Sequence, residues 1–449
     1  MSRPSTEAEY LASLTPASAR FSRRSLLRGA LGAGAAIAGV SSLAACGSSS
    51  GGTSGTGGTA SATGTVTLGS NQSDQVPKTA LAKVVSDFQA ANSGLTVNIN
   101  TVDHNTFQNN INTYLQGNPD DVFTWFAGYR MRFFASKGLA GDISDVWQNL
   151  TGMSDALKKS STGDDGKQYF VPSTYYPWAV HYRQSVWDKH GYKVPTTLAE
   201  FTALCDQMRK DGLTPIAFAD KDGWPAMGTF DILNMRINGY DFHVSLMAGK
   251  EDWTGAKVQK VFDTWTSLAK YQQSDSLGRT WQEAAQGLQQ GKAGMYYLGT
   301  FVAQQFTAAQ QADLKFFNFP EVDPSVGAGA IDAPIDGYMM SKRPKNEAGA
   351  KKLLLYLGGP DAQLVSVTAD TSVVATNSKV DTSKYTALQK AEVEFVSKAT
   401  SIAQFLDRDT RPDFASTVIT PALQSYIQNP SDITTILGQI ESQKKALFS

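Results

Sequence analysis

The sequence predicts an α/β fold in which two lobes, each with a doubly wound mixed sheet, are joined by three hinge crossings. Three observations support this prediction. The chain has 449 residues, which is too long for one hydrophobic core. Strand and helix patterns alternate over residues 66–126, which is typical of a mostly parallel sheet. Residues 166–182 have the pattern of a strand that leaves one sheet, crosses and enters another.

The first lobe is expected to begin with three strands separated by two helices. The first helix carries apolar residues at helical spacing, among them Leu81, Val84 and Phe88. Because ligands of doubly wound sheets bind beyond the carboxyl ends of the strands, polar residues there are candidates for a site. The strands are expected at 66–68, 95–99 and 121–126. The segments at their carboxyl ends are 70–74, 103–104 and 125–129.

The stretch 166–182, GKQYFVPSTYYPWAVHY, is expected to connect the lobes. Pro177 disfavours helix at Tyr176, so the middle of the stretch should be extended. Because Tyr175, Tyr176 and Trp178 cannot all face one core, we expect aromatic side chains to line a cleft at this crossing. The alternative is a kinked strand pair whose aromatic residues all belong to a core.

The second lobe is expected to follow the crossing and to finish at the end of the chain. Capping boxes at Thr197–Glu200 and Thr280–Glu283 mark the starts of two of its helices. A return crossing is expected at 331–341 and a third crossing at 371–376. The lobes are therefore expected to comprise 65–176 with 333–371, and 177–332 with 372–449.

The first 45 residues have the features of an export signal rather than of a folded segment. Arg23 and Arg24 resemble a twin-arginine motif, and a short apolar run rich in Ala and Gly follows them. Residues 43–46, LAAC, resemble a lipobox, which implies acylation of the Cys46 thiol and cleavage before it. The alternative is an ordinary signal peptide with an incidental cysteine. Residues 46–64, rich in Gly, Ser and Thr, are expected to be a flexible tether.

Composition and motifs argue against several function classes. A net charge of −1 gives no indication of a nucleic-acid partner, and abundant uncharged polar residues favour a neutral polar ligand. The sequence contains no nucleophile elbow, zinc-protease motif, Walker loop or dinucleotide fingerprint, and its four histidines lack metal-like spacing. We therefore expect no catalytic residue, no metal and no cofactor. Adjacent aspartates at 120–121 and 164–165 leave a glycoside hydrolase open, although such pairs are more often solvated turn residues.

Aromatic and polar side chains near strand ends are the candidate ligand contacts. Sugars present apolar C–H faces that stack on aromatic rings, and hydroxyl rims that bond to Asp, Asn and Arg. A few aromatic residues with a few convergent polar groups make a small-ligand site. Trp178, at the crossing, is the first candidate for stacking, and Trp224, in a Gly-Trp-Pro loop, is the second. Tyr175 is a further candidate on the same crossing.

Four segments in order resemble the extracellular solute-binding proteins of bacterial carbohydrate ABC importers, family 1, maltose-binding-protein-like, of lipoprotein type. They are 166–172, 178–182, 194–201 and 212–216, and the resemblance extends over nearly the whole mature chain. It implies a two-lobed periplasmic-binding-protein-like fold. It also implies a monomer, lipid-anchored on the extracytoplasmic face of the cell membrane, that captures a sugar or short oligosaccharide. The loaded protein would dock on membrane permease subunits driven by an ATPase, without turnover of the ligand.

The resemblance implies ligand contacts in the first lobe. Trp125 follows the motif Asn118–Phe123 and should lie at the cleft, the alternative being a core tryptophan. Asn71 and Asp74 follow the first strand, where relatives often have polar contacts. Asp74 has an alternative role as the N-cap of the next helix.

Later segments supply further candidates by the same resemblance. Phe301 occupies a turn where relatives often have tryptophan, so stacking there should be weaker. Asp336, at the return crossing, either bonds a sugar hydroxyl or stabilises the hinge turn. In the charged cluster 407–413 we favour Arg411 as a contact held by Asp409, the alternative being a solvated, salt-bridged loop.

Two other functions remain open from sequence alone. One is a receptor for another polar solute, such as a polyol or a glycerol phosphoester. A phosphate would need basic groups or a helix N-terminus, and Arg130 and Arg411 are the candidates. The other is a lipid-anchored glycan hydrolase, which would release product from a sugar polymer.

Overall fold

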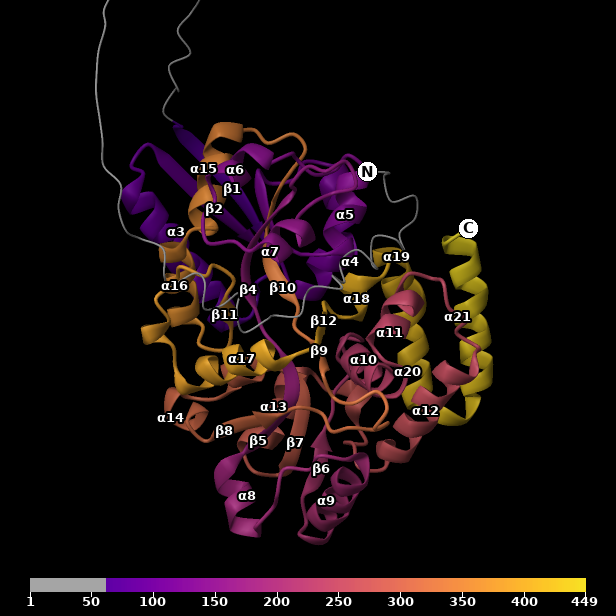
Figure 1. Ribbon diagram of the computed structural model, residues 1–449. Coiled ribbons are helices and arrows are strands. Elements are labelled where there is room, and N and C mark those ends of the chain that lie inside the picture. Colours follow the sequence, from indigo (N-terminus) through magenta and orange to yellow (C-terminus); the bar gives the residue numbers. More distant parts are fainter. Residues whose placement is uncertain (1–61) are drawn as a thin grey trace, which may run out of the picture.

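The computed structural model describes residues 62–449, which form two lobes, with β1 (Gly64–Ser70) to β3 (Val122–Phe126) in the upper part of Figure 1 and β5 (Trp178–Arg183) to β8 (Leu314–Phe317) in the lower part. The export motif at Arg23 and Arg24, the lipidation site Cys46 and the tether up to residue 61 lie outside the described residues. Indigo and purple segments from the start of the described chain make most of one lobe, and orange segments from the 330s onward return to it (Figure 1). The chain therefore visits the first lobe twice.

The first lobe is built on a six-stranded mixed sheet in the order β11-β4-β10-β3-β1-β2. β1 pairs in parallel with β2 and β3, as the alternating pattern predicts, and β10 runs antiparallel to both β3 and β4. The strands are β1 (Gly64–Ser70), β2 (Leu95–Thr101), β3 (Val122–Phe126), β4 (Phe170–Tyr175), β10 (Ile335–Met340) and β11 (Val374–Ala375). The helices are α3 (Gln75–Ala91), α4 (His104–Gln116), α5 (Tyr129–Ser136), α6 (Ser144–Asn149), α7 (Asp155–Ser160), α15 (Glu347–Leu357) and α16 (Pro360–Ala369).

The second lobe has a four-stranded sheet in the order β6-β7-β5-β8, in which only β6 and β7 are parallel. A two-stranded sheet of β9 and β12 lies near the connections. The strands are β5 (Trp178–Arg183), β6 (Thr214–Ala217), β7 (Ala293–Gly299), β8 (Leu314–Phe317), β9 (Ala330–Asp332) and β12 (Ser401–Ala403). The helices before the return crossing are α8 (Gln184–His190), α9 (Leu198–Lys210), α10 (Pro225–Asn238), α11 (Tyr240–Met247), α12 (Ala256–Ala269), α13 (Trp281–Gln289) and α14 (Ala308–Gln311). The later helices are α17 (Ala387–Lys398), α18 (Leu406–Asp409), α19 (Pro412–Phe414), α20 (Thr420–Gln428) and α21 (Ile433–Leu447).

Three connections join the lobes. The first runs from β4 to β5 through Tyr176 and Pro177, within the stretch that the sequence analysis singled out. The second runs from β9 to β10. The third runs from β11 to α17 and begins later than the sequence predicted. Val374 and Ala375 still pair with β4 in the first sheet, beyond the expected boundary at residue 371.

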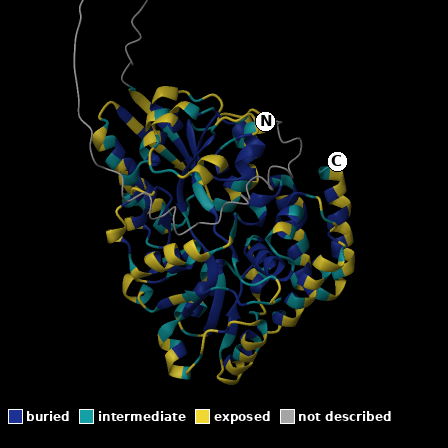
Figure 2. Cartoon of the chain, viewed as in Figure 1, coloured by how far each residue is buried: buried dark blue, intermediate teal, exposed yellow. Residues whose placement is uncertain are grey.

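The helices pack on the sheets through the apolar faces that their sequences predict. In α3 the buried side chains include Leu81, Val84 and Phe88, three or four residues apart. Figure 2 shows the same arrangement in general: buried residues fill the sheets and the inner faces of helices, and exposed residues lie on the outer faces. Both predicted capping boxes form, at the starts of α9 and α13. Within residues 62–449, no helix has the length and apolar character needed to span a bilayer.

A candidate ligand site between the lobes

A cavity of about 310 Å³ lies between the lobes. Its first-lobe wall comes from the segments at the carboxyl ends of β1, β2 and β3, which meet at one edge of the sheet because these strands are parallel. Its second-lobe wall comes from the loop before α10 and the start of α13. The connections complete the lining, together with the turn that contains α18. The site is therefore formed jointly by the two lobes and by the connections between them.

Aromatic rings form one wall of this cavity. Trp178 packs face to face with Phe405, with ring centroids 4.7 Å apart and planes 27° apart. Trp224 and Phe301 meet Trp178 edge-on, each with centroids 6.2 Å away. On another side, the six-membered ring of Trp178 lies so close to Gly228 that a Cβ there would clash with it. Trp178 is thus enclosed, whereas Trp224 and Phe301 are only partly buried and retain free ring surface.

A network of paired charges adjoins these rings. Arg408 donates from Nη1 to Asp336 at 2.8 Å and from Nη2 to the Tyr176 hydroxyl at 2.8 Å. Its guanidinium carbon also lies 4.0 Å from the ring centre of Phe126, at the end of β3. This one side chain therefore joins the late turn, the return crossing and the first crossing. Burial raises the pKa of Asp336, and the neighbouring Arg408 guanidinium opposes that shift.

The segment after β1 supplies a second polar cluster. Asn71 accepts a hydrogen bond from the Thr124 hydroxyl at 2.9 Å, while its buried Nδ2 has no partner in the structure. An unpartnered buried donor beside a cavity is suited to a ligand oxygen. Asp74 stands at the N-cap position of α3 but makes no side-chain cap; it accepts from Gln282 of the second lobe at 3.1 Å. Asp74 is therefore the N-cap of α3 by position, as the alternative predicted, but its side chain bonds the second lobe rather than the helix.

The lining is acidic. Of the described residues that line the cavity, six are aspartates and Arg408 is the one lysine or arginine. Burial raises the pKa of four of these aspartates, Asp74, Asp222, Asp336 and Asp370. His104 is half-buried, and desolvation lowers its pKa to about 4, so its imidazole is neutral at pH 7. The site therefore offers mostly carboxylate acceptors.

The lobes touch each other at the mouth of the cavity as well as at the connections. Asn105, at the start of α4, donates to Asp222 of the second lobe at 2.9 Å. The bond from Gln282 to Asp74 is a second contact of this kind. Because both bonds join different lobes, the described arrangement is a closed one.

The structure brings most of the predicted site residues to one cavity. The predicted residues in its lining are Asn71, Asp74, Trp125, Trp178, Trp224, Phe301 and Asp336. Trp125 is also a core residue, 1% exposed, as the alternative predicted, and its role as a ligand contact stays a prediction. The face of Trp178 that was expected to stack on a sugar is occupied by Phe405.

Three predicted residues lie outside the lining. Tyr175 is displaced by its neighbour Tyr176, because successive side chains of an extended segment point in opposite directions. Asp409 accepts from the backbone N–H of Gln404 at 2.8 Å and faces the turn instead. Arg411 bonds Asp413 rather than Asp409, so the expected Asp409–Arg411 pair is wrong.

The charged cluster 407–413 reaches the cavity through Asp407 and Arg408 rather than through Asp409 and Arg411. Residues 406–409 form one helical turn, which directs Asp407 and Arg408 to the cavity and places Asp409 behind them. This four-residue helix, which begins one residue before the cluster 407–413, gives no apolar pattern in the sequence. Four further lining residues were not predicted: Asn105, Asp222, Trp281 and Phe405. The available signals were a position just after a strand and a position beside a capping box.

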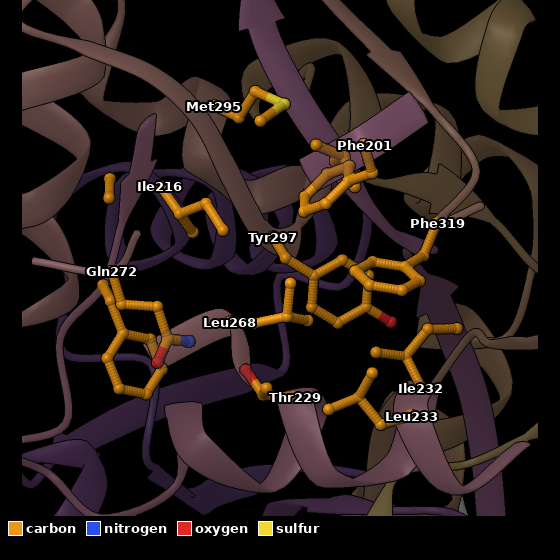
Figure 3. A pocket seen from close by; sticks show the side chains of 13 residues that line it. Phe201, Ile216, Thr229, Ile232, Leu233, Leu268, Gln272, Met295, Tyr297 and Phe319 are labelled. Atoms are coloured by element: carbon orange, nitrogen blue, oxygen red, sulfur yellow. The ribbon is translucent and has the colours of Figure 1, made fainter. Parts of the chain in front are cut away.

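A second, much smaller cavity lies inside the second lobe (Figure 3). Its volume is about 30 Å³, and side chains such as Phe201, Tyr297 and Phe319 point into it. Space of this size and mostly apolar lining suits a packing gap that could hold a water molecule rather than a ligand. Among residues 62–449, no three His, Cys, Asp or Glu side chains are grouped to hold a metal ion.

The fold and the cleft together define a receptor for a small solute, and comparison with known proteins gives its class. The chain belongs to the family of bacterial extracellular solute-binding proteins, whose model matches residues 83–393. An uncharacterised ABC transporter extracellular-binding protein of Pyrococcus horikoshii is 24% identical over 260 residues, 56% of each chain. A probable sugar-binding periplasmic protein of Rhizobium meliloti is 27% identical over 44% of this chain and 50% of its own. The chain thus spans about half the length of these curated relatives.

Solved structures extend the comparison over the whole described body. The bacterial solute receptor AcbH superposes with a TM-score of 0.84 and 46% identity, covering 86% of this chain and 99% of AcbH. AcbH is described as having an exclusive preference for β-D-galactopyranose. A chitin oligosaccharide binding protein shares the fold, with a TM-score of 0.77 at 21% identity, covering 85% of this chain and 98% of its own.

Proposed function

We propose that this protein captures a sugar outside the cell and delivers it to the membrane permease of an ABC importer. The observation that carries the proposal is the closed cavity that partly exposed Trp224 and Phe301 line together with six aspartates. Aromatic rings suit the C–H face of a sugar, and carboxylates accept hydrogen bonds from its hydroxyl rim. Nothing in this chemistry requires a catalytic group, and we propose binding without turnover.

The charges of the site favour a neutral ligand over a phosphoester. Arg408 is paired with Asp336, and Arg130, behind the lining, donates to Asp407 at 2.7 Å. Each arginine therefore already has an anionic partner in this arrangement. A phosphate would also face the acidic side chains that surround Arg408. The glycerol phosphoester alternative is accordingly disfavoured, whereas a polyol remains compatible with the same contacts.

The size of the cavity favours a small ligand. A volume of about 310 Å³ is at the lower end of the range of small-molecule sites, which is ~300–1,000 Å³. The 46% identity to AcbH supports a galactopyranose as the first ligand to test. We therefore place single hexoses ahead of oligosaccharides.

Closure would couple ligand capture to delivery. A sugar that contacts both walls stabilises the closed form, because the open form separates those contacts. The mouth bond between Asn105 and Asp222 would form at the same step. The permease could then distinguish loaded from empty protein by the relative position of the lobes.

We further propose that the protein acts as a monomer held on the extracytoplasmic face of the membrane by acylated Cys46. The support is in the sequence: Arg23 and Arg24, the lipobox, and the tether of residues 46–64. A Cys46→Ala precursor should lose incorporation of radiolabelled palmitate. Retention of the label in that variant would contradict the anchor.

A thermal-shift screen of the purified protein against hexoses, disaccharides and polyols tests the function. A ligand that binds only the native state raises the melting temperature, and we expect a neutral hexose to give the largest rise. Product analysis of the same samples should show no change in the sugar. Release of new sugars over time would favour the hydrolase instead.

A further inference from the structure

Phe405 has an unusual backbone conformation for a residue with a side chain. Its φ is 116° and its ψ is 143°, and among residues 62–449 it is the one non-glycine residue with positive φ. That region of backbone space is almost restricted to glycine because a Cβ crowds the neighbouring carbonyl. A strained aromatic residue in the wall of a ligand cavity calls for a functional reason.

Two buried carboxylates hold this conformation. Asp409 accepts from the backbone N–H groups of Gln404, at 2.8 Å, and of Phe405, at 3.3 Å. Asp231, on α10, accepts from the N–H of Leu406 at 2.7 Å. Three consecutive amides are thus fixed by side chains from both sides of the turn. Burial raises the pKa of Asp409 to about 7, so keeping this carboxyl in the interior is unfavourable unless its bonds are needed.

The backbone conformation of Phe405 determines where its ring lies. Phe405 is 4% exposed and covers the indole face of Trp178, at 4.7 Å between centroids. The indole is also closed off by Gly228. Without Phe405, the uncovered face of Trp178 would be a second platform in the cavity, beside the free surfaces of Trp224 and Phe301. A second sugar ring could stack there.

We propose that Phe405 limits the site to a single sugar ring by occupying the face of Trp178 on which a second ring would stack. Asp409 and Asp231 are positioning residues that hold Phe405 there. This inference rests on the proposed function, since it concerns the size of the sugar that the same cavity accepts. We therefore attribute the strained backbone of Phe405 to selection of the ligand rather than to a requirement of folding.

The test is the ratio of affinities for D-galactose and for the disaccharide lactose, measured by calorimetry on the wild type and on Phe405→Gly. Glycine fits the backbone and removes the ring, so we expect the preference for the monosaccharide to fall by at least about tenfold. Phe405→Leu is the matched control. Leucine keeps an apolar side chain at the same position, and we expect the ratio to stay within about threefold of the wild type.

A second pair of variants leaves Phe405 in place. Asp409→Ala removes the acceptor for two amides and should lower the ratio in the same direction. Asp409→Asn keeps a side-chain oxygen and should restore the ratio. This pair decides the question if Phe405→Gly does not fold, because a purely structural role would change the melting temperature without changing the ratio.

If Phe405→Gly and Asp409→Ala still bind sugar with unchanged affinity ratios, the role of Phe405 in limiting ligand size is contradicted, while the proposed sugar binding stands. Failure of the wild type to bind any sugar would overturn the proposed function, and this inference with it.

Discussion

Arg408 and Asp336 form an ion pair with 2.8 Å between Nη1 and Oδ1, which ties the turn before the C-terminal helices to the return crossing. The Arg408 side chain is 8% exposed, so the pair is mostly shielded from water. Its guanidinium also holds the Tyr176 hydroxyl of the first crossing. The polar wall of the cavity and the connections between lobes are therefore parts of one network.

Removal of Arg408 should weaken sugar binding strongly. We expect Arg408→Ala to reduce the affinity by at least about tenfold, ~1.4 kcal/mol, because Asp336 and Tyr176 lose the group that orients them. The melting temperature should also fall, since a mostly buried carboxylate is left unpaired. Calorimetry and thermal unfolding measure the two effects.

Arg411→Ala is the matched control for that variant. Arg411 bonds Asp413 and the carbonyl of Leu447, away from the cavity lining. We expect its affinity to stay within about twofold of the wild type. A loss at Arg411 equal to that at Arg408 would contradict the assignment of the cavity.

Trp224 should supply the free aromatic face. Trp224→Ala is expected to weaken binding by about tenfold, because its partly exposed indole is lost and the smaller ring of Phe301 beside it is left to stack alone. Trp224→Phe should retain most of the affinity. Equal losses in both variants would indicate that the indole N–H, rather than the ring face, makes the contact.

The bond between Asn105 and Asp222 should affect how long the sugar stays bound. One cross-lobe hydrogen bond contributes about 0.5–1.5 kcal/mol, so Asn105→Ala should speed dissociation by roughly two- to tenfold. Stopped-flow tryptophan fluorescence measures this rate. The association rate should change little, because the bond forms only on closure; a change confined to association would argue against a closing contact.

Titration of Asp220 should make the stability of the folded protein depend on pH. Burial raises the pKa of this carboxyl to about 8, and its Oδ2 is buried without a partner. Between the unfolded pKa, about 3.9, and the folded one, the folded state binds the extra proton. The contribution of Asp220 to stability is therefore complete below pH ~4 and is lost as the pH rises through about 8.

Asp220→Asn isolates this contribution from those of other groups. The amide can still accept from the N–H of Ala226, as Asp220 does at 2.8 Å, but it cannot ionise. We expect the melting temperature of the wild type to fall by at least about 2 °C more than that of the variant between pH 6 and pH 9. Parallel pH profiles would show that Asp220 does not titrate in this range.

The fold was largely predictable because its signals are local. The strand and helix patterns of residues 66–126 and the crossing at 166–182 depend on periodicity and on proline positions, which sequence shows directly. The two capping boxes formed for the same reason. The third crossing was placed too early, because two-residue β11 is too short to give a pattern.

The site was predictable only in part, because it depends on orientation. Loop positions identified Asn71, Asp74 and Trp224, but nothing in the sequence could show that Phe405 would cover Trp178. The choice between Arg408 and Arg411 depended on one helical turn, whose phase decides which side chain faces the cavity. Tyr175 was predicted in place of Tyr176, because the sequence does not show which of two successive side chains in an extended segment faces the cavity.

The most direct test of the account is a crystal structure with the hexose that gives the largest thermal shift. We predict one sugar ring between the lobes, with a face on Trp224 and hydroxyl groups bonded to Asp336 and Asn71. Electron density for the sugar on an outer surface, or in the cavity without contact to both lobes, would contradict it.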